Sequence, residues 1–231
     1  MMAIGNAPRL LLIGHGRMGR LVEALAPEAG FRVAGAVAGA NAGDPSGWPA
    51  ADVAIDFSVA AAVPVTVRHL AERGMPIVIG TTGWSVQEAA VREIAARHGV
   101  GVVAAANFAL GVNLLLALAE RAGELLRGRP EFGAWIHELH HAAKRDAPSG
   151  TALALRARLE RAGYAAPIDV SSTRAGSIPG THTLGFDAAA ETITLTHAAR
   201  DRTAFARGAL EAARWVQGRE GWFGMRDVLG I

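Results

Sequence analysis

The residues most capable of acid–base chemistry lie in one short segment. Lys144 is the only lysine in a chain with 22 arginines, and it follows two adjacent histidines, His140 and His141. An ammonium group can have its proton affinity tuned and can donate that proton, whereas an arginine stays charged. Imidazole titrates near neutral pH. This grouping favours an acid–base and substrate-binding cluster.

An anion site is predicted directly after this segment. Pro148 prevents a continuous helix from Lys144, and Ser149 is a favourable N-cap residue for a helix beginning at about Ala152. The amides of Ser149, Gly150 and Thr151 would then be free to bind a carboxylate or a phosphate. We therefore expect a cation, imidazoles and a helix N-terminus to converge on a small anionic molecule.

Other interpretations of the cluster stay open. Lys144 alone would be an ordinary surface lysine, and His140 and His141 alone a hydrogen-bonded structural pair. Metal ligands usually come with carboxylates or cysteines at recognisable spacing, so no metal is predicted. A serine hydrolase is a further alternative, but the chain has no Gly-x-Ser-x-Gly motif.

A glycine-rich turn at the start of the chain predicts dinucleotide binding. Gly14-x-Gly16-x-x-Gly19 follows the apolar run Arg9–Ile13 and precedes a helical pattern. Such glycines permit a tight turn, the approach of a pyrophosphate, and close packing of helix on strand. No acidic residue follows the second strand before Asp44, and no arginine replaces it unless Arg17 does. The choice between NADH and NADPH is therefore open.

Three more turns are expected at the same edge of a sheet, where open α/β sheets bind ligands. Each of these turns alone would be an ordinary connection, but together they favour a nicotinamide site. They are Asp56-Phe57-Ser58, Gly80-Thr81-Thr82-Gly83 and Ala105-Ala106-Asn107-Phe108.

The elements that position these residues follow two patterns. Up to about Phe108, wholly apolar runs alternate with amphipathic helices, which indicates a parallel sheet covered on both faces. Later strands alternate apolar and polar residues, as in Glu191–His197, which indicates a half-exposed antiparallel or mixed sheet. We expect an α/β protein with a Rossmann-type doubly wound sheet, residues 1–108 plus 207–231. An inserted α+β domain, residues 109–206, would bind substrate and mediate oligomerisation.

Composition excludes several classes of protein. Half of the 231 residues are hydrophobic, which excludes disorder, and the absence of cysteine excludes thiolate chemistry and disulfides. The formal net charge is only +2, without a long basic run, so nucleic acid is not an expected partner. The uncharged stretch 99–119 contains asparagines and glycines, which argues against a membrane span. No secretory signal is recognisable, and a cytoplasmic location is expected.

The segment Glu138–Ala152 closely resembles the signature E-x-H-H-x-x-K-x-D-x-P-S-G-T-A of the 4-hydroxy-tetrahydrodipicolinate (dihydrodipicolinate) reductase family of lysine biosynthesis. Four other segments match in order, so the resemblance spans nearly the whole chain. They are Gly14–Gly19, Gly80–Gly83, Ala106–Asn113 and Gly224–Leu229.

The resemblance implies a role for each matching residue. His140 aligns with the acid/base residue and Lys144 with the proton donor, and the substrate is a cyclic imine with two carboxylates. Substrate contacts are implied for His141, Gly150 and Thr151, and the helix start adds Ser149 to the expected substrate-binding residues. Contacts with NADH or NADPH are implied for Gly14, His15, Gly16, Arg17, Met18, Gly19, Gly80, Thr81, Thr82, Ala105, Ala106, Asn107 and Phe108. The turn after the third strand adds Phe57 to the expected cofactor-binding residues. Family members are usually homotetramers.

Two departures from the family pattern concern the cofactor. The glycine loop is one residue shorter than the common Gly-x-x-Gly-Arg-Met-Gly, and the charged pair after the second strand is absent. Two other functions stay open: another nicotinamide-dependent dehydrogenase of amino acids or semialdehydes, and a dinucleotide-binding sensor without catalysis.

Overall fold

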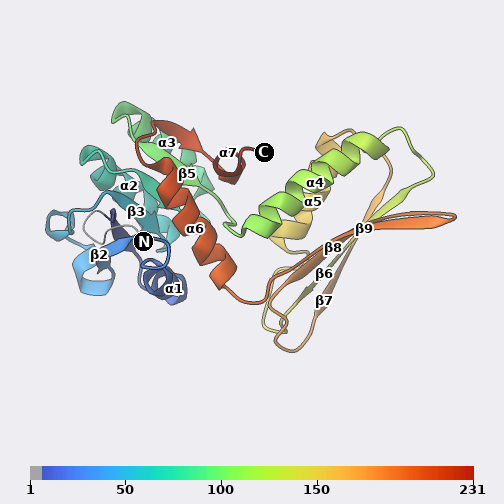
Figure 1. Cartoon of the computed structure of the whole chain (residues 1–231), viewed down its shortest axis with the longest axis horizontal. Coiled ribbons are helices and arrows are strands. Elements are labelled where there is room, and N and C mark those ends of the chain that lie inside the picture. Colours follow the sequence, from blue (N-terminus) through green and yellow to red (C-terminus); the bar gives the residue numbers. More distant parts are fainter. Residues whose placement is uncertain (1–6) are drawn as a thin grey trace. The chain divides into compact units, whose positions relative to one another are not determined.

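The computed structural model describes residues 7–231, which divide into two compact units (Figure 1). One unit comprises the chain through Ala109 together with Thr203–Ile231, and the other comprises Leu110–Arg202. Among the described residues, no helix is both long enough and apolar enough to cross a membrane.

The first unit is built on a six-stranded parallel sheet with the order β10-β5-β4-β3-β1-β2. Its strands are short, and the central ones are wholly apolar or nearly so because both faces of the sheet are covered. The strands are β1 (Arg9–Ile13), β2 (Arg32–Val37), β3 (Val53–Asp56), β4 (Ile77–Ile79), β5 (Gly101–Ala104) and β10 (Gly221–Phe223). The helices are α1 (Arg17–Leu25), α2 (Val63–Glu72), α3 (Glu88–Arg97), α6 (Thr203–Val216) and α7 (Met225–Leu229).

Two helices, α2 and α3, cover one face of this sheet, where Val67 and Val91 pack with Leu11 and Ile77 in a continuous core. Helix α6 contacts β3, β4 and β5 and packs beside α1 (Figure 1). Parallel strands align their carboxyl ends, so the loops after β1, β3, β4 and β5 share one edge. This arrangement confirms the expected doubly wound sheet.

The second unit is a four-stranded sheet with two helices packed on one face (Figure 1). The strand order is β7-β6-β8-β9, with β6 and β7 parallel and the other neighbours antiparallel, which confirms a mixed sheet. The elements are α4 (Leu110–Leu126), β6 (Gly133–His140), α5 (Gly150–Arg161), β7 (Ile168–Arg174), β8 (Thr181–Ala188) and β9 (Glu191–Ala198).

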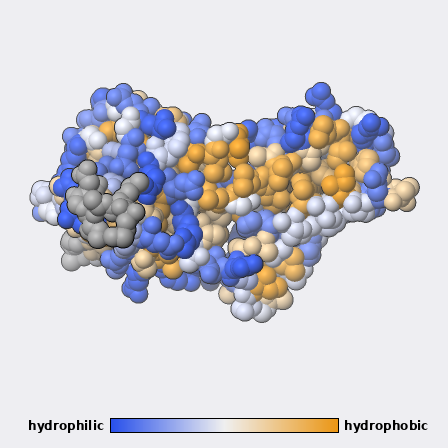
Figure 2. Space-filling view, viewed as in Figure 1, coloured by the Kyte–Doolittle hydropathy of each residue, from blue (hydrophilic) through white to orange (hydrophobic). Residues whose placement is uncertain are grey.

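The core of this unit lies between its helices and its sheet. Leu115 of α4 and Leu155 of α5 meet Ile136 and Phe186 of the strands. Helix α4 also carries leucines that stay exposed, at positions 114, 118 and 125. Figure 2 shows hydrophobic residues along this helix.

Candidate functional site

Strand β6 carries two polar side chains on its buried face. Glu138 and His140 alternate with half-exposed residues, so they point toward the same side as Ile136. The antiparallel register places His182 of β8 opposite Glu138, and the parallel register places Arg174 of β7 opposite His140. Three adjacent strands thus bring together four polar groups that are far apart in the sequence.

The carboxylate of Glu138 is fully buried, and its two oxygens face different partners. Its Oε1 accepts a hydrogen bond of 2.6 Å from Nη2 of Arg174, and its Oε2 contacts Nδ1 of His140. Arg174 Nη2 also donates to the carbonyl of Asp146, at 2.6 Å. The guanidinium therefore ties the carboxylate to the loop that carries Lys144.

The charges of the cluster set its protonation. Burial opposes ionisation of Glu138, but hydrogen bonds from Arg174 and Ser172 and nearby positive charges outweigh it and lower its pKa to about 2. Burial lowers the pKa of His140, and the positive charges of Lys144 and Arg174 lower it further. The carboxylate of Glu138 raises it, but not enough to offset these effects. Burial also lowers the pKa of His182, to about 4. These shifts favour the ionised carboxylate and the neutral form of both rings.

The side chain of Lys144 is 23% exposed and is held by a neighbour. Its Nζ donates to both carboxylate oxygens of Asp146, at 2.7 and 2.9 Å. The lysine hydrogen bond lowers the pKa of Asp146. The backbone N–H of Lys144 donates to the carbonyl of His141, which closes a turn after β6. His141 itself is half-buried beside this turn.

Ser149 caps helix α5, as the sequence predicts. Its Oγ accepts a hydrogen bond from the N–H of Ala152 and lies 3.0 Å from Nε2 of His182. Gly150 is exposed, and a Cβ added there would meet nothing within 4 Å. An exposed glycine thus stands at the start of a helix, where backbone N–H groups can bind an anion.

The glycine turn has the geometry that a dinucleotide needs. Gly14 has a φ of +89°, and a Cβ on Gly19 would lie 2.1 Å from the carbonyl oxygen of Gly14. A Cβ on Gly16, the N-cap residue of α1, would meet nothing within 4 Å. The first and third glycines are therefore required by packing, whereas the second leaves open space at a helix N-terminus. His15 contacts Glu23 at 2.6 Å, and Arg17 is exposed.

The loops after β3 and β4 are held together by Asp56. Its Oδ1 accepts hydrogen bonds of 2.8 Å from both the hydroxyl of Thr81 and the N–H of Ser58. Burial raises the pKa of this carboxyl, against those hydrogen bonds. A Cβ on Gly80 would overlap the ring of Phe57, which makes an edge contact with the buried ring of Phe108. Phe108 therefore supports this edge of the sheet by packing, because only 2% of the residue is exposed.

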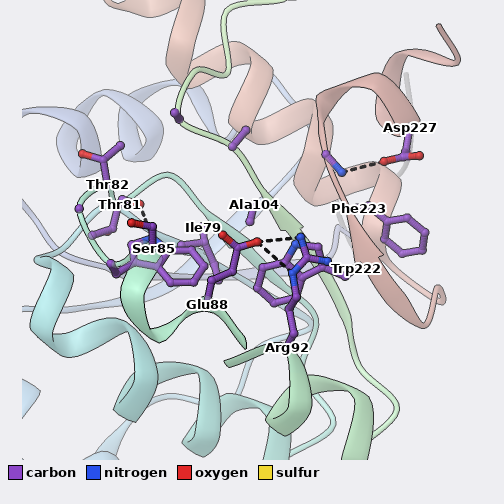
Figure 3. A pocket seen from close by; sticks show the side chains of 15 residues that line it. Ile79, Thr81, Thr82, Ser85, Glu88, Arg92, Ala104, Trp222, Phe223 and Asp227 are labelled. Carbon is purple, nitrogen blue, oxygen red and sulfur yellow. Dashed lines mark hydrogen bonds and ion pairs between the residues drawn. The ribbon is translucent and has the colours of Figure 1, made fainter. Parts of the chain in front are cut away.

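A cavity of about 440 Å³ lies at this edge of the sheet (Figure 3). Four of the residues with an expected cofactor role line it: Thr81, Thr82, Ala105 and Ala106. Aromatic and charged side chains also line it: Arg92 lies over the ring of Trp222 and pairs with Glu88.

Two family models match consecutive parts of the chain. The model described as Dihydrodipicolinate reductase, N-terminus, matches residues 8–108, and the one described as Dihydrodipicolinate reductase, C-terminus, matches residues 111–229. The chain belongs to the dihydrodipicolinate reductase family. The two models together span nearly all the described residues, so the family resemblance seen in the sequence motifs is confirmed.

Individual members of the dihydrodipicolinate reductase family agree over most of their length. A 4-hydroxy-tetrahydrodipicolinate reductase of Acidiphilium cryptum is 43% identical, with 94% of each chain covered. One from Christiangramia forsetii is 32% identical over 95% of this chain and 97% of its own. The dipicolinate-bound dihydrodipicolinate reductase of Paenisporosarcina sp. TG-14 shares the fold, with a TM-score of 0.79, 20% identity, and 95% and 98% of the two chains covered.

Sequence motifs of the dihydrodipicolinate reductase family did not reveal every polar residue of the cluster. Arg174 and His182 lie outside the recognised segments, and Glu138 lies inside one without an expected role. The signal that could have found His182 is weak: a histidine in an alternating strand, on the same face as Leu184.

One group of atoms in the described part of the chain has the composition of a metal site. Carboxylate or ring-nitrogen atoms of Glu138, His140 and His182 lie within 4.8 Å of one another. The guanidinium of Arg174 already pairs with this carboxylate, and the charge of Lys144 acts on His140. Because two cations already face the group, a divalent ion is disfavoured.

Proposed function

We propose that this protein reduces 4-hydroxy-tetrahydrodipicolinate to tetrahydrodipicolinate with NADH or NADPH and loss of water, in diaminopimelate and lysine biosynthesis. Relatives that match nearly the whole chain are named for this reaction. The observation that carries the proposal is the grouping, in one small unit, of the His140 imidazole, the Lys144 ammonium and the open start of α5.

These groups suit a cyclic imine with two carboxylates. The amides of Gly150 and Thr151 would hold one carboxylate at the helix N-terminus, with the Ser149 cap keeping that turn in place. His141 would orient the ring. The solved relative is described as bound to dipicolinate, itself a ring with two carboxylates, which supports this class of ligand.

The residues of the chain then manage protons and charge. When bound, a reduced nicotinamide cofactor supplies the hydride for this chemistry. Negative charge develops toward the ring nitrogen of the substrate, and a proton must neutralise it. Lys144 or His140 donates that proton, and the positive charge of Lys144 lowers the barrier electrostatically. Lys144 would have to exchange its contact with Asp146 for one with the substrate.

The cofactor would be held by the first unit. The open space at Gly16 and the N-terminus of α1 fit a pyrophosphate, with His15, Arg17 and Met18 beside it. Thr81, Thr82, Ala105, Ala106 and Asn107 would bind the nicotinamide end, supported by the packing of Phe57, Gly80 and Phe108.

The oligomer stays a prediction from the family. The face of the mixed sheet that points away from α4 and α5 carries half-exposed residues of β6, namely Trp135, His137 and Leu139. A face of this kind suits contact with other copies of the chain. Analytical ultracentrifugation would test the expected homotetramer.

One assay separates the candidate functions. The condensation product of pyruvate and aspartate semialdehyde is supplied as substrate, and the absorbance of NADH and of NADPH is followed in separate reactions. Substrate-dependent oxidation supports the proposal and gives the cofactor preference. Reduction of NAD⁺ or NADP⁺ by amino acids, or turnover only with semialdehydes, would indicate a different dehydrogenase. Cofactor binding without turnover of any of these substrates would indicate a sensor.

A further inference from the structure

A buried carboxylate and a guanidinium lie behind His140, and the mechanism above does not use them. Glu138 is inaccessible to solvent, and its two oxygens face different partners, Arg174 at Oε1 and His140 at Oε2. Burying a carboxylate is costly unless it is paired and hydrogen-bonded. An apolar side chain at this position would fill the core without that cost, so packing alone does not explain a carboxylate here.

We propose that Glu138, held by Arg174, is a positioning residue that fixes the tautomer and orientation of the His140 ring. This inference rests on the proposed role of His140 as an acid or base. An ionised carboxylate only accepts hydrogen bonds, and a guanidinium only donates them. Nδ1 of His140 must therefore carry a hydrogen, which leaves Nε2 as the atom that gains or loses a proton.

The surroundings of Nε2 fit this assignment. Gly180 lies beside the ring, and a Cβ added there would come within 3.1 Å of Nε2. Its φ of +144° is also a conformation that other residues rarely adopt. The absence of a side chain at this position therefore leaves room at the nitrogen that the carboxylate does not occupy.

The charged and titratable groups that face His140 come from every neighbouring element. They are Glu138 on the same strand, Arg174 on β7, His182 on β8, and Lys144 in the loop with its partner Asp146. Burial and the two cations favour the neutral ring, whereas the carboxylate of Glu138 favours the charged ring. Its carboxylate thus keeps the imidazolium accessible in a site that otherwise opposes it.

The variant Glu138→Gln tests the inference with the smallest change in shape. Arg174 and His140 lie at different oxygens of the carboxylate, so the single oxygen of the amide can face only one of them. With that oxygen on the guanidinium, the amide NH₂ faces Nδ1, and the hydrogen of the neutral ring moves to Nε2. We expect kcat to fall about 10- to 100-fold, as for other residues that orient a histidine. We expect little change in KM or in the affinity for NADH.

Two further readouts distinguish positioning from a merely structural role. ¹⁵N NMR of histidine-labelled protein should show the Nδ1–H tautomer of His140 in the wild type and the Nε2–H tautomer in Glu138→Gln. The limb of the kcat/KM profile that His140 controls should move to lower pH in the variant, because the carboxylate that favours imidazolium is gone. Glu191→Gln, an exposed change in the same unit, is the matched control.

A second pair of variants covers the case in which Glu138→Gln does not fold. Arg174→Met removes the clamp on the carboxylate, whereas Arg174→Lys keeps a positive charge. We expect Arg174→Met to lower kcat and to alter the His140 resonances, and Arg174→Lys to restore part of both.

Several results would overturn the inference. A folded Glu138→Gln protein with unchanged tautomer, pH profile and kcat would do so, as would Arg174→Met that behaves as the wild type. A metal ion bound stoichiometrically to purified wild type and lost in Glu138→Gln would instead make Glu138 a ligand. The NMR measurement needs no turnover, so a wild type inactive in the assay above would refute the proposed function without deciding this question.

Discussion

The hydroxyl of Ser149 lies 3.0 Å from Nε2 of His182, a residue 33 positions later on β8. The same hydroxyl accepts the N–H of Ala152 and so begins helix α5. One side chain thus links the start of the helix to the strand that lies beside Glu138 and His140. The position of the expected anion site is coupled in this way to the position of the expected acid–base group.

Replacing Ser149 should affect both stability and substrate binding. Ser149→Ala removes the N-cap and leaves Nε2 of His182 without its partner, so the free energy of unfolding should fall by about 1 kcal/mol or more. KM for the substrate should rise, because the first turn of α5 is less ordered. Ser149→Thr keeps the hydroxyl and should recover most of both. Urea denaturation and steady-state kinetics measure these effects, and a wild-type KM in Ser149→Ala would contradict the role of the capped helix start.

Lys144 should be needed for the chemical step rather than for folding. Lys144→Ala should lower kcat by a factor of about 10² to 10⁴, the range for a positioned proton donor. Lys144→Arg keeps the charge but cannot release a proton at neutral pH, so it should remain strongly impaired. The adjacent exposed Arg145 offers a control, since Arg145→Ala should leave kcat nearly unchanged. Normal turnover in Lys144→Arg would show that the charge alone is needed.

Two glycines of the dinucleotide turn should respond differently to the same substitution. Gly19→Ala places a Cβ against the carbonyl of Gly14 and should cost about 1–3 kcal/mol of stability. Gly16→Ala has room and an ordinary φ of −77°, so the melting temperature should hold while affinity for NADH and NADPH falls. Gly128→Ala, at another open position, serves as the control. Nucleotide binding unaffected by Gly16→Ala would place the pyrophosphate elsewhere.

The protein should lose stability as the pH falls below 6.5. Unfolded His182 takes up a proton near that pH, whereas the folded residue, with a pKa of about 4, does not. The unfolded state then binds more protons, so stability rises with pH across this window, by about 1.4 kcal/mol per pH unit for one proton. The lowered pKa of His140 acts in the same direction. The lowered pKa of Glu138 extends the loss of stability as the pH falls from 4.5 toward 2.

Denaturation of His182→Gln at several pH values tests this dependence. The slope of stability against pH between 6.5 and 4 should be smaller than in the wild type. His98→Gln changes an exposed histidine and should leave the slope as it is. Equal slopes in all three proteins would exclude His182 as the source.

Local features could be predicted from the sequence. The turn Gly14–Gly19 and the Ser149 cap depend on a few neighbouring residues, and both have the expected geometry. Strand β10, Gly221–Phe223, was not predicted, because three residues carry no periodicity and form a strand only by pairing with β5. The C-terminal return of the chain was expected, but its place at the edge of the sheet was not.

The amino-acid sequence by itself determined the alternation of strands and helices, the glycine turn, and the presence of a histidine, a lysine and a helix start within a dozen residues. Only the tertiary structure decided that Arg174 and His182 join them around Glu138. The register of the strands brings these side chains together, and the register depends on which faces of the three strands are buried against α4 and α5. A single-residue slip would turn each of these side chains to the other face, and nothing local to Arg174 or His182 specifies the register.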